Sequence, residues 1–144
     1  MKKQKEGRKK FMYSKEIAGV LKNYLDSISY AYDFCEEKGM FSFRAKSGGG
    51  IKSIFFKIEV KKNSYRIFAS PKNIKIENDD VCTKAEYKHK KGGLQRTSHF
   101  EMDKGDKTVM CIQDVSCEKT IPDSKFIGEG FADIFYFISE HFAA

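Results

Sequence analysis

The apolar positions that follow Ser14 repeat with the period of an α-helix. They fall three or four residues apart, at Ile17, Val20, Leu21, Tyr24, Leu25 and Ile28. Serine is a favoured N-cap residue, because its hydroxyl accepts a hydrogen bond from a backbone N–H of the first turn. The pattern therefore predicts an amphipathic helix that starts after Ser14 and buries one face.

From Ile28 the pattern changes to a period of two. Apolar residues alternate with small or polar ones as far as Cys35, and the polar run 36–39 follows. Such alternation is typical of a half-buried strand. We therefore expect a strand over 28–35 that ends at a turn over 36–39.

Three turns, at 36–39, 47–50 and 61–64, fix the pairing of four predicted strands, because opposite residues in antiparallel strands share a face. The predicted pairs are Cys35 with Met40, Phe34 with Phe41, Tyr32 with Phe43, Tyr30 with Ala45, Lys46 with Ile51, Phe43 with Ile54, Phe41 with Phe56, Val60 with Tyr65, Ile58 with Ile67 and Phe56 with Ala69. All turns agree on one apolar face, which carries Tyr30, Tyr32, Phe34, Phe41, Phe43, Ile54, Phe56, Ile58, Val60, Tyr65 and Ile67. We predict a four-stranded antiparallel meander.

Pro71 and the polar residues up to Asp80 interrupt this pattern, and the segment 81–91 fits two interpretations. Asp79 or Asp80 could cap a short helix that Gly92 closes. Alternatively, the segment is a strand with alternating Val81, Thr83, Ala85 and Tyr87. We favour the helix.

A hairpin follows, with strands over 94–102 and 107–117 around a turn at 103–106. Its predicted pairs are Phe100 with Val109, Ser98 with Cys111 and Leu94 with Val115. The apolar residues of both strands again share one face, so this hairpin also has a buried side.

The last element is a helix from Pro122-Asp123 to about Phe142, since proline is tolerated in a first helical turn. Its main apolar stripe is Ile127, Phe131, Ile134, Phe135 and Ile138, and a second line is Phe126, Gly130, Asp133 and Phe137, with Tyr136 on a further side. Glycine costs about 1 kcal/mol relative to alanine in a helix interior. Gly128 and Gly130 therefore predict close packing against this helix.

Together these elements predict an α+β fold, an antiparallel β-meander sheet flanked by an N-terminal and a C-terminal helix, in the order α-β-β-β-β-(α)-β-β-α. For 144 residues we expect a single domain over 13–144 after a basic flexible leader over 1–12. No apolar run approaches the ~18 residues of a membrane helix, and no signal peptide is recognised. We therefore expect a cytoplasmic protein without membrane contact.

The net charge of +7 arises from 27 Lys and Arg and 20 Asp and Glu. Much of the excess lies in the leader, in Lys2, Lys3, Lys5, Arg8, Lys9 and Lys10 against Glu6 alone. A second basic stretch contains Lys84, Lys88, Lys90, Lys91 and Arg96. Both stretches fit solvated segments, and the alternative is that they bind an anionic partner.

The residues able to carry chemistry form no recognised catalytic or metal-binding motif. The four cysteines lack a C-x-x-C spacing, so we expect buried small apolar side chains. They are Cys35, Cys82, Cys111 and Cys117. His99 and Glu101 share a strand face, which fits a solvated polar pair better than an acid–base pair. The glycines at 48–50 match neither a P-loop nor a dinucleotide-binding loop, and we expect no enzyme activity, cofactor or metal.

Aromatic residues near lysines can also stack on single-stranded nucleic acid. The predicted aromatic face, however, also carries aliphatic residues, at Ile54, Ile58, Val60 and Ile67. Two helices with apolar stripes are available to cover it. We therefore expect this face to form the core.

The order of elements resembles the YbjN-like group of bacterial proteins, whose fold is similar to the class I type III secretion chaperones. The resemblance rests on Tyr24-Leu25-Asp26 with the segment 29–34, on 54–60, and on 100–103 leading into 109–115 and the last helix. It covers most of residues 14–142, and the basic leader and the middle segment depart from it. The resemblance implies a non-enzymatic binding module, often dimeric, regulatory or chaperone-like, with no catalytic residues to carry over.

We expect a protein-binding module, as a homodimer, that presents an apolar helix surface or a sheet edge to another protein or peptide. Phe126, Tyr136 and Phe137 lie off the main stripe of the last helix and are the candidate partner-binding residues. The alternative is a nucleic-acid-binding protein that uses the leader and the stretch 84–96. Its anion-binding residues would be Lys2, Lys3, Lys5, Arg8, Lys9, Lys10, Lys88, Lys90 and Lys91.

Overall fold

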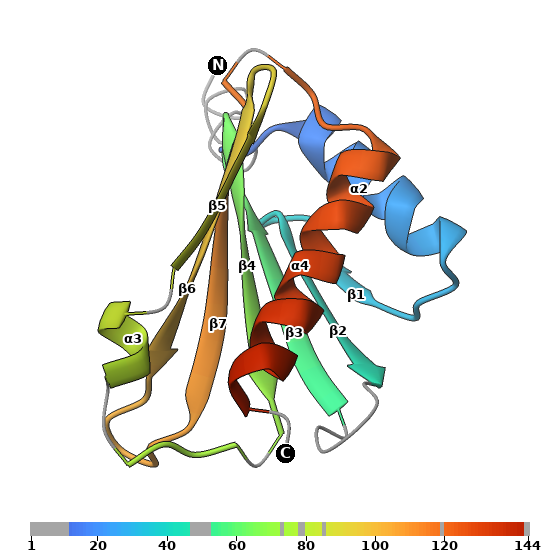
Figure 1. The fold of residues 1–144 in the computed structure, drawn as a ribbon. Coiled ribbons are helices and arrows are strands. Elements are labelled where there is room, and N and C mark those ends of the chain that lie inside the picture. The colour runs from blue at the N-terminus through green and yellow to red at the C-terminus, as the bar shows by residue number, and fades with distance from the viewer. Residues whose placement is uncertain are drawn as a thin grey trace.

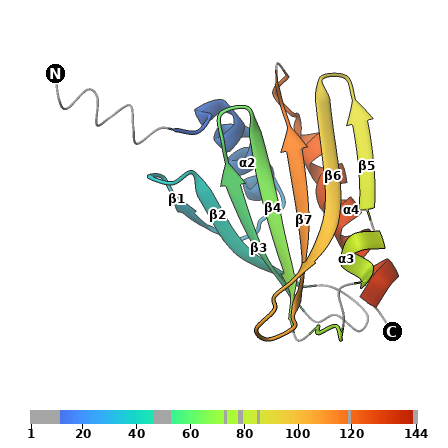
Figure 2. The same cartoon turned by 90° about the vertical axis from the view of Figure 1, so that its left-hand side faces the viewer.

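A seven-stranded antiparallel sheet forms the centre of the protein, in the order β1-β2-β3-β4-β7-β6-β5. The computed structural model describes residues 12–46, 53–72, 74–77, 80–84, 86–118 and 120–142. The strands are β1 (Asp33–Cys35), β2 (Met40–Lys46), β3 (Ser53–Val60), β4 (Ser64–Pro71), β5 (Glu86–Lys91), β6 (Leu94–Met102) and β7 (Val109–Ser116), and the helices are α2 (Lys15–Ser27), α3 (Asp80–Lys84) and α4 (Ser124–Phe142). Helices α2 and α4 lie on the same face of the sheet (Figure 1 and Figure 2). The predicted α+β class, with an N-terminal and a C-terminal helix, is confirmed.

Helix α2 starts where the sequence predicts. The Ser14 hydroxyl accepts a hydrogen bond from the Ile17 N–H at 3.1 Å, and the Ser14 N–H donates to the Lys61 carbonyl at 3.0 Å. The buried face of the helix carries Ile17, Ala18, Leu21 and Leu25. The cap therefore both starts the helix and ties it to the end of β3.

The strand predicted over 28–35 is wrong for residues 28–32. The last turn of α2 continues through hydrogen bonds from Ile28 to Tyr24 and from Tyr30 to Leu25, and Ser29 takes a left-handed φ of 60°. A strand cannot run through that conformation, so β1 begins only at residue 33. The rings of Tyr30 and Tyr32 nevertheless pack on Phe43 and Phe41, with centroids 5.4 and 5.6 Å apart.

The predicted apolar face is the core. Its residues in β2, β3 and β4 are all buried beneath the helices, and they are Phe41, Phe43, Ile54, Phe56, Ile58, Val60, Tyr65 and Ile67. The pairs predicted between β1 and β2 at Cys35–Met40 and Phe34–Phe41 are confirmed. The register between β3 and β4 is also confirmed.

Two other registers differ from the prediction by two residues. Phe43 lies opposite Phe56 rather than Ile54, and Phe100 lies opposite Cys111 rather than Val109. A shift of two residues keeps each side chain on the same face of the sheet, so the predicted core residues are still on the buried face. The first connection spans 47–52, so the glycine loop predicted at 47–50 lies outside the described residues.

The second shift has a visible local cause in the β6–β7 turn. The Asp103 carboxylate accepts a hydrogen bond from the Gly105 N–H at 2.8 Å, and the Asp106 carboxylate accepts one from the Thr108 N–H at 3.0 Å. Lys107 takes a left-handed φ of 63°. These side-chain turns hold a loop over 103–108, longer than the predicted four residues.

The helix favoured for 81–91 is wrong beyond residue 84. Helix α3 has only five residues, and β5 follows it and pairs with β6. Lys91 lies opposite Leu94, so Gly92 and Gly93 form a two-residue hairpin turn. Gly92 has a φ of 60°, which suits such a turn.

Helix α4 begins as predicted, because the Asp123 carboxylate accepts a hydrogen bond from the Phe126 N–H at 2.8 Å. The expectation that Phe126 and Phe137 form an uncovered apolar surface is wrong. These side chains are only 2% and 5% exposed, because α4 lies across β6 and β7 as well as β3. Tyr136 alone of the three is open to solvent, at 68%.

The two glycines of α4 lie where the helix approaches its neighbours most closely. A methyl group at Gly130 would lie 2.9 Å from the Gln113 Oε1 atom, and one at Gly128 would lie 3.3 Å from the Tyr24 ring. Both approaches confirm the predicted close packing. Tyr24 in turn stacks on Phe131, with centroids 5.6 Å apart.

We expect Gly130→Ala to lower the free energy of unfolding by about 1–2 kcal/mol, even though alanine favours a helix by about 1 kcal/mol. The added methyl group would push the buried Gln113 side chain off its hydrogen bonds. Gly128→Ala is the matched control, because it faces a partly buried ring, and we expect a change within about 0.5 kcal/mol of zero. Urea denaturation measures both, and equal effects would contradict this account of the helix contact.

The cysteines divide by position. Cys111 and Cys117 are buried as predicted, and burial raises the pKa of their thiols to about 12 and about 11. Both therefore stay protonated at neutral pH. Cys82 is half-buried, and Cys35 is exposed in β1, so the prediction of burial is wrong for Cys35.

Candidate functional site

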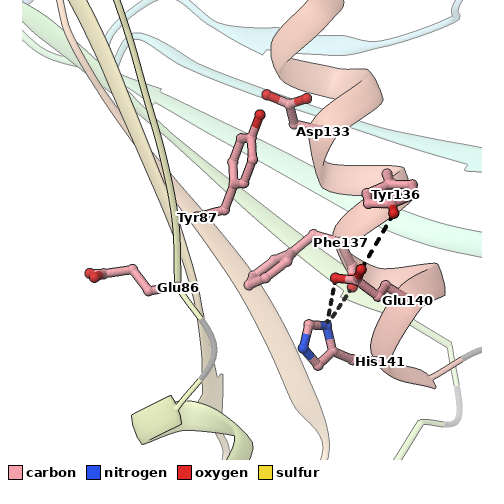
Figure 3. A pocket seen from close by; sticks show the side chains of 7 residues that line it. All are labelled: Glu86, Tyr87, Asp133, Tyr136, Phe137, Glu140 and His141. Carbon is pink, nitrogen blue, oxygen red and sulfur yellow. Dashed lines mark hydrogen bonds and ion pairs between the residues drawn. The ribbon is translucent and has the colours of Figure 1, made fainter.

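A cavity of about 360 Å³ lies between the edge strand β5 and the C-terminal half of α4. Two lining residues come from β5 and five from α4, and they are Glu86, Tyr87, Asp133, Tyr136, Phe137, Glu140 and His141. The α4 residues follow the pattern i, i+3, i+4, i+7 and i+8, so they share one side of the helix. Figure 3 shows the lining side chains, of which Glu86 points away from α4, and we call this space the β5–α4 cavity.

The apolar wall of the β5–α4 cavity is anchored in the core. Phe137 stacks on Phe100 of β6, with centroids 4.4 Å apart and planes 6° from parallel. His141 meets both rings edge-on, at 5.0 and 5.3 Å, and its Nδ1 atom lies 3.0 Å from the Phe137 carbonyl oxygen. This wall is therefore held in place by packing from the sheet side.

A buried ion pair supports the other end of the cavity. Arg96 of β6 is 2% exposed, and its Nε donates to the Asp133 carboxylate at 2.8 Å. The Arg96 guanidinium also lies 4.6 Å from the centroid of the Phe126 ring and donates to the Phe126 carbonyl at 3.4 Å. Asp133 therefore faces the cavity with its charge already balanced and its orientation fixed.

Two further polar residues lie beside Arg96 on the helix-facing side of the sheet. Gln113 of β7 donates from Nε2 to the Ser98 hydroxyl at 3.2 Å and to the Gly130 carbonyl at 3.1 Å. Its Oε1 atom is buried without a hydrogen-bond partner among the described residues. The polar groups of this cluster hold α4 in place over β6 and β7.

The mouth of the cavity is acidic. Tyr136 donates from its hydroxyl to the Glu140 carboxylate at 3.4 Å, and His141 Nδ1 lies 3.9 Å from the same carboxylate (Figure 3). Glu86 of β5 lies at the rim, but its carboxylate points away from α4 and has the Lys88 ammonium 3.8 Å away (Figure 3). Glu140 is 51% exposed, so its carboxylate remains accessible to a ligand.

This arrangement suits a cationic side chain. Carboxylates bind lysine and arginine through charge-assisted hydrogen bonds, and aromatic rings attract cations through their faces. The β5–α4 cavity offers both, from Glu140 and from Tyr87, Tyr136 and Phe137. Within the ranges that the structure describes, no cluster of His, Cys, Asp or Glu has the size of a metal site.

The structure separates the residues that the sequence singled out. Tyr136 and Phe137 line the cavity, whereas Phe126 is buried away from it against Arg96. The leader residues up to Lys10 lie outside the described part of the chain, as does the Lys84 side chain. Lys88, Lys90 and Lys91 are exposed on β5, but the burial of Arg96 removes it from any anion-binding surface.

The sequence analysis missed the Arg96–Asp133 pair, although a signal for it was present. Arg96 lies two residues from Leu94 and four from Phe100, on the face predicted to be buried. A charge at such a position predicts a partner. Asp133 lies on the second line of α4, in register with Phe126 and Phe137.

His99 and Glu101 form a pair at 3.0 Å on the face of the sheet opposite α4, where His99 lies directly opposite Glu86. This fits the predicted solvated polar pair. Among the helices described, none is long and apolar enough to cross a membrane.

Comparison with known proteins finds no match, whether to family models, to curated proteins or to solved structures. The resemblance to the YbjN-like group therefore stays a prediction.

Proposed function

We propose that this protein is a non-enzymatic binding module. It binds an extended polypeptide segment along β5, and one basic side chain of that segment enters the β5–α4 cavity. The single observation that carries the proposal is the cavity itself, in which carboxylates and aromatic rings meet beside an edge strand. A chaperone-like or regulatory role follows from such an activity.

The edge strand supports the backbone part of this proposal. Strand β5 is the last strand of the sheet and pairs on one side with β6. An extended peptide can add to such an edge through main-chain hydrogen bonds, and its alternate side chains then reach the two faces of the sheet. Tyr87 faces the helix side, so the peptide residue beside it would point into the cavity.

The charges along β5 specify the partner further. Lys88 and Lys90 alternate with Tyr87 and His89, and so occupy the face away from α4. Cross-strand neighbours of opposite charge are stabilising, and like charges are destabilising. The segment that fits best therefore carries an arginine or lysine toward the cavity and a glutamate at the neighbouring position beside Lys88, with an uncharged residue beside Glu86.

The homodimer is a separate proposal. Burial of Phe126 and Phe137 removes the apolar helix surface that motivated it. Lysines on an edge strand oppose pairing of that strand with a second copy of itself. If the protein dimerises, we expect another surface to be used, and light scattering on purified protein measures the oligomeric state.

The test uses a synthetic peptide, acetyl-Thr-Val-Glu-Arg-Thr-Val-Thr-amide, titrated into the full-length protein and followed by backbone NMR. We expect the largest shifts at β5 and at Tyr136 and Glu140. Glu140→Gln should weaken binding about tenfold, as for loss of one charge-assisted contact, and Glu37→Gln is the control, because Glu37 is an exposed carboxylate in the β1–β2 turn. Shifts confined to other elements would reject the site.

A further inference from the structure

The face of the sheet opposite α2 and α4 carries a second set of aromatic residues, which we call the outer face. Phe55 of β3 is 37% exposed there, and Phe68 of β4 is partly exposed. Ile112 of β7 lies directly opposite Phe68 and is 1% exposed, so apolar side chains on this face shield one another. Helices α2 and α4 both lie on the other face of the sheet (Figure 2).

Cations lie over both rings. The Arg44 guanidinium is 5.4 Å from the centroid of Phe55, and the Lys57 ammonium is 5.1 Å from the centroid of Phe68. Arg66 also approaches Phe68, at 5.9 Å, but its charge is balanced by an ion pair with Asp114. Arg44 and Lys57 form no ion pair with a described residue.

The pairing of β3 with β4 sets the distance between the two rings on the outer face. Phe55 lies opposite Ser70, two residues from Phe68, so the two rings are diagonal neighbours on adjacent strands. Such neighbours lie about 7–8 Å apart. Two successive bases of a single strand can each stack on one ring at that spacing.

We infer that the outer face over β2–β4 binds single-stranded nucleic acid, with bases stacked on Phe55 and Phe68 and phosphates held by Arg44 and Lys57. Charge complementarity selects this occupant. The outward positions of these three strands carry Arg44, Lys46, Lys57 and Arg66 against Glu59 alone. Single-stranded nucleic acid is a polyanion with flat apolar bases, so it matches both the cations and the aromatic rings of this surface.

The surface is distinct from the segment that the sequence singled out for nucleic acid. The stretch 84–96 lies in β5 and β6, at the far edge of the sheet from β2, and contains the buried Arg96. On the outer face, Glu101 of β6 and Asp114 of β7 limit the basic area to the strands on the β2 side. The site is also separate from the β5–α4 cavity, so it stands independently of the proposed peptide binding.

The test is fluorescence anisotropy of the full-length protein with labelled oligo(dT) of about 20 nucleotides, at low salt. We expect Phe55→Ala and Phe68→Ala each to weaken binding about tenfold, from the loss of one stacked base. Phe55→Leu keeps an apolar side chain, and should show the same loss if stacking is responsible. Tyr136→Ala is the control, since it removes an exposed ring outside the site.

The salt dependence separates phosphate contacts from stacking. Arg44→Gln with Lys57→Gln should lower the slope of log K against log salt by about 0.7 per phosphate contact removed. The phenylalanine variants should leave that slope unchanged. The inference is overturned if oligo(dT) does not bind at about 0.1 mM protein in low salt, or if binding is lost on deleting residues 1–10 but is indifferent to Phe55→Ala and Phe68→Ala.

Discussion

Replacing Phe56 with alanine is expected to lower the free energy of unfolding by about 3–5 kcal/mol. Phe56 is fully buried in β3, and its ring meets those of Phe43, Phe131 and Phe135 at 5.1, 5.4 and 5.6 Å. The substitution leaves a cavity where strands β2 and β3 meet α4, and these three rigid rings cannot collapse into it. Chemical denaturation followed by circular dichroism measures the loss.

Phe55→Ala is the matched control for this prediction. It removes the same ring from the neighbouring residue of the same strand, but from the outer face. We expect a loss below about 1 kcal/mol, since most surface substitutions have small effects. Comparable losses for the two variants would contradict the assignment of inner and outer faces, and a small loss for Phe55→Ala keeps that variant usable in binding experiments.

Asp133→Ala is expected to cost about 3 kcal/mol, because it leaves the buried Arg96 guanidinium without its carboxylate. The Arg96 side chain is 3% exposed and retains only the Phe126 carbonyl and ring as partners. Asp133→Asn keeps an acceptor for the Arg96 Nε–H and should cost less. The double variant Arg96→Met with Asp133→Leu should recover most of the loss, since a well-packed apolar pair can replace a buried ion pair.

A thermal or chemical denaturation series on these variants checks the pair. If Asp133→Ala unfolds like the wild-type protein, the pair does not hold α4 against β6. A destabilised double variant with no recovery would instead indicate that the Arg96 contacts with Phe126 carry the effect.

Much of the fold could be predicted because local patterns and tertiary structure agree in it. The Ser14 cap, the apolar stripe of α2 and the alternation in β3 and β4 each depend on residues close in sequence. The inner face was predicted even where the register was not, because alternation fixes the face of a residue and not its partner. Hairpin register depends on turn geometry, which at 103–108 comes from side-chain hydrogen bonds that a strand pattern does not reveal.

The candidate site was less predictable, for a physical reason. The β5–α4 cavity joins Tyr87 to residues about fifty positions later, and it exists only because 86–91 pairs with β6 as an edge strand. If this segment were the helix that the sequence favours, the sheet would have no edge strand here and the cavity would not form. Residues of α4 were recognised as unusual, but only the packing of Phe137 on Phe100 shows which face they use.

The outer face was overlooked for a related reason. Both sides of β3 carry phenylalanine, at 55 and 56, and the aliphatic residues around Phe56 directed attention to the inner side. Arg44 and Lys57 lie on two different strands, so their approach to Phe55 and Phe68 emerges only from the pairing of β2, β3 and β4.

The most direct test of peptide binding in the β5–α4 cavity is a charge-reversal cycle at Glu140, measured by isothermal titration calorimetry. The wild-type protein should bind the peptide that carries arginine at its centre, and Glu140→Lys should weaken that binding at least about tenfold. A peptide with glutamate at the centre should bind Glu140→Lys more tightly than it binds the wild-type protein. If Glu140→Lys instead binds the arginine peptide as tightly as the wild-type protein does, the cavity does not receive the basic side chain.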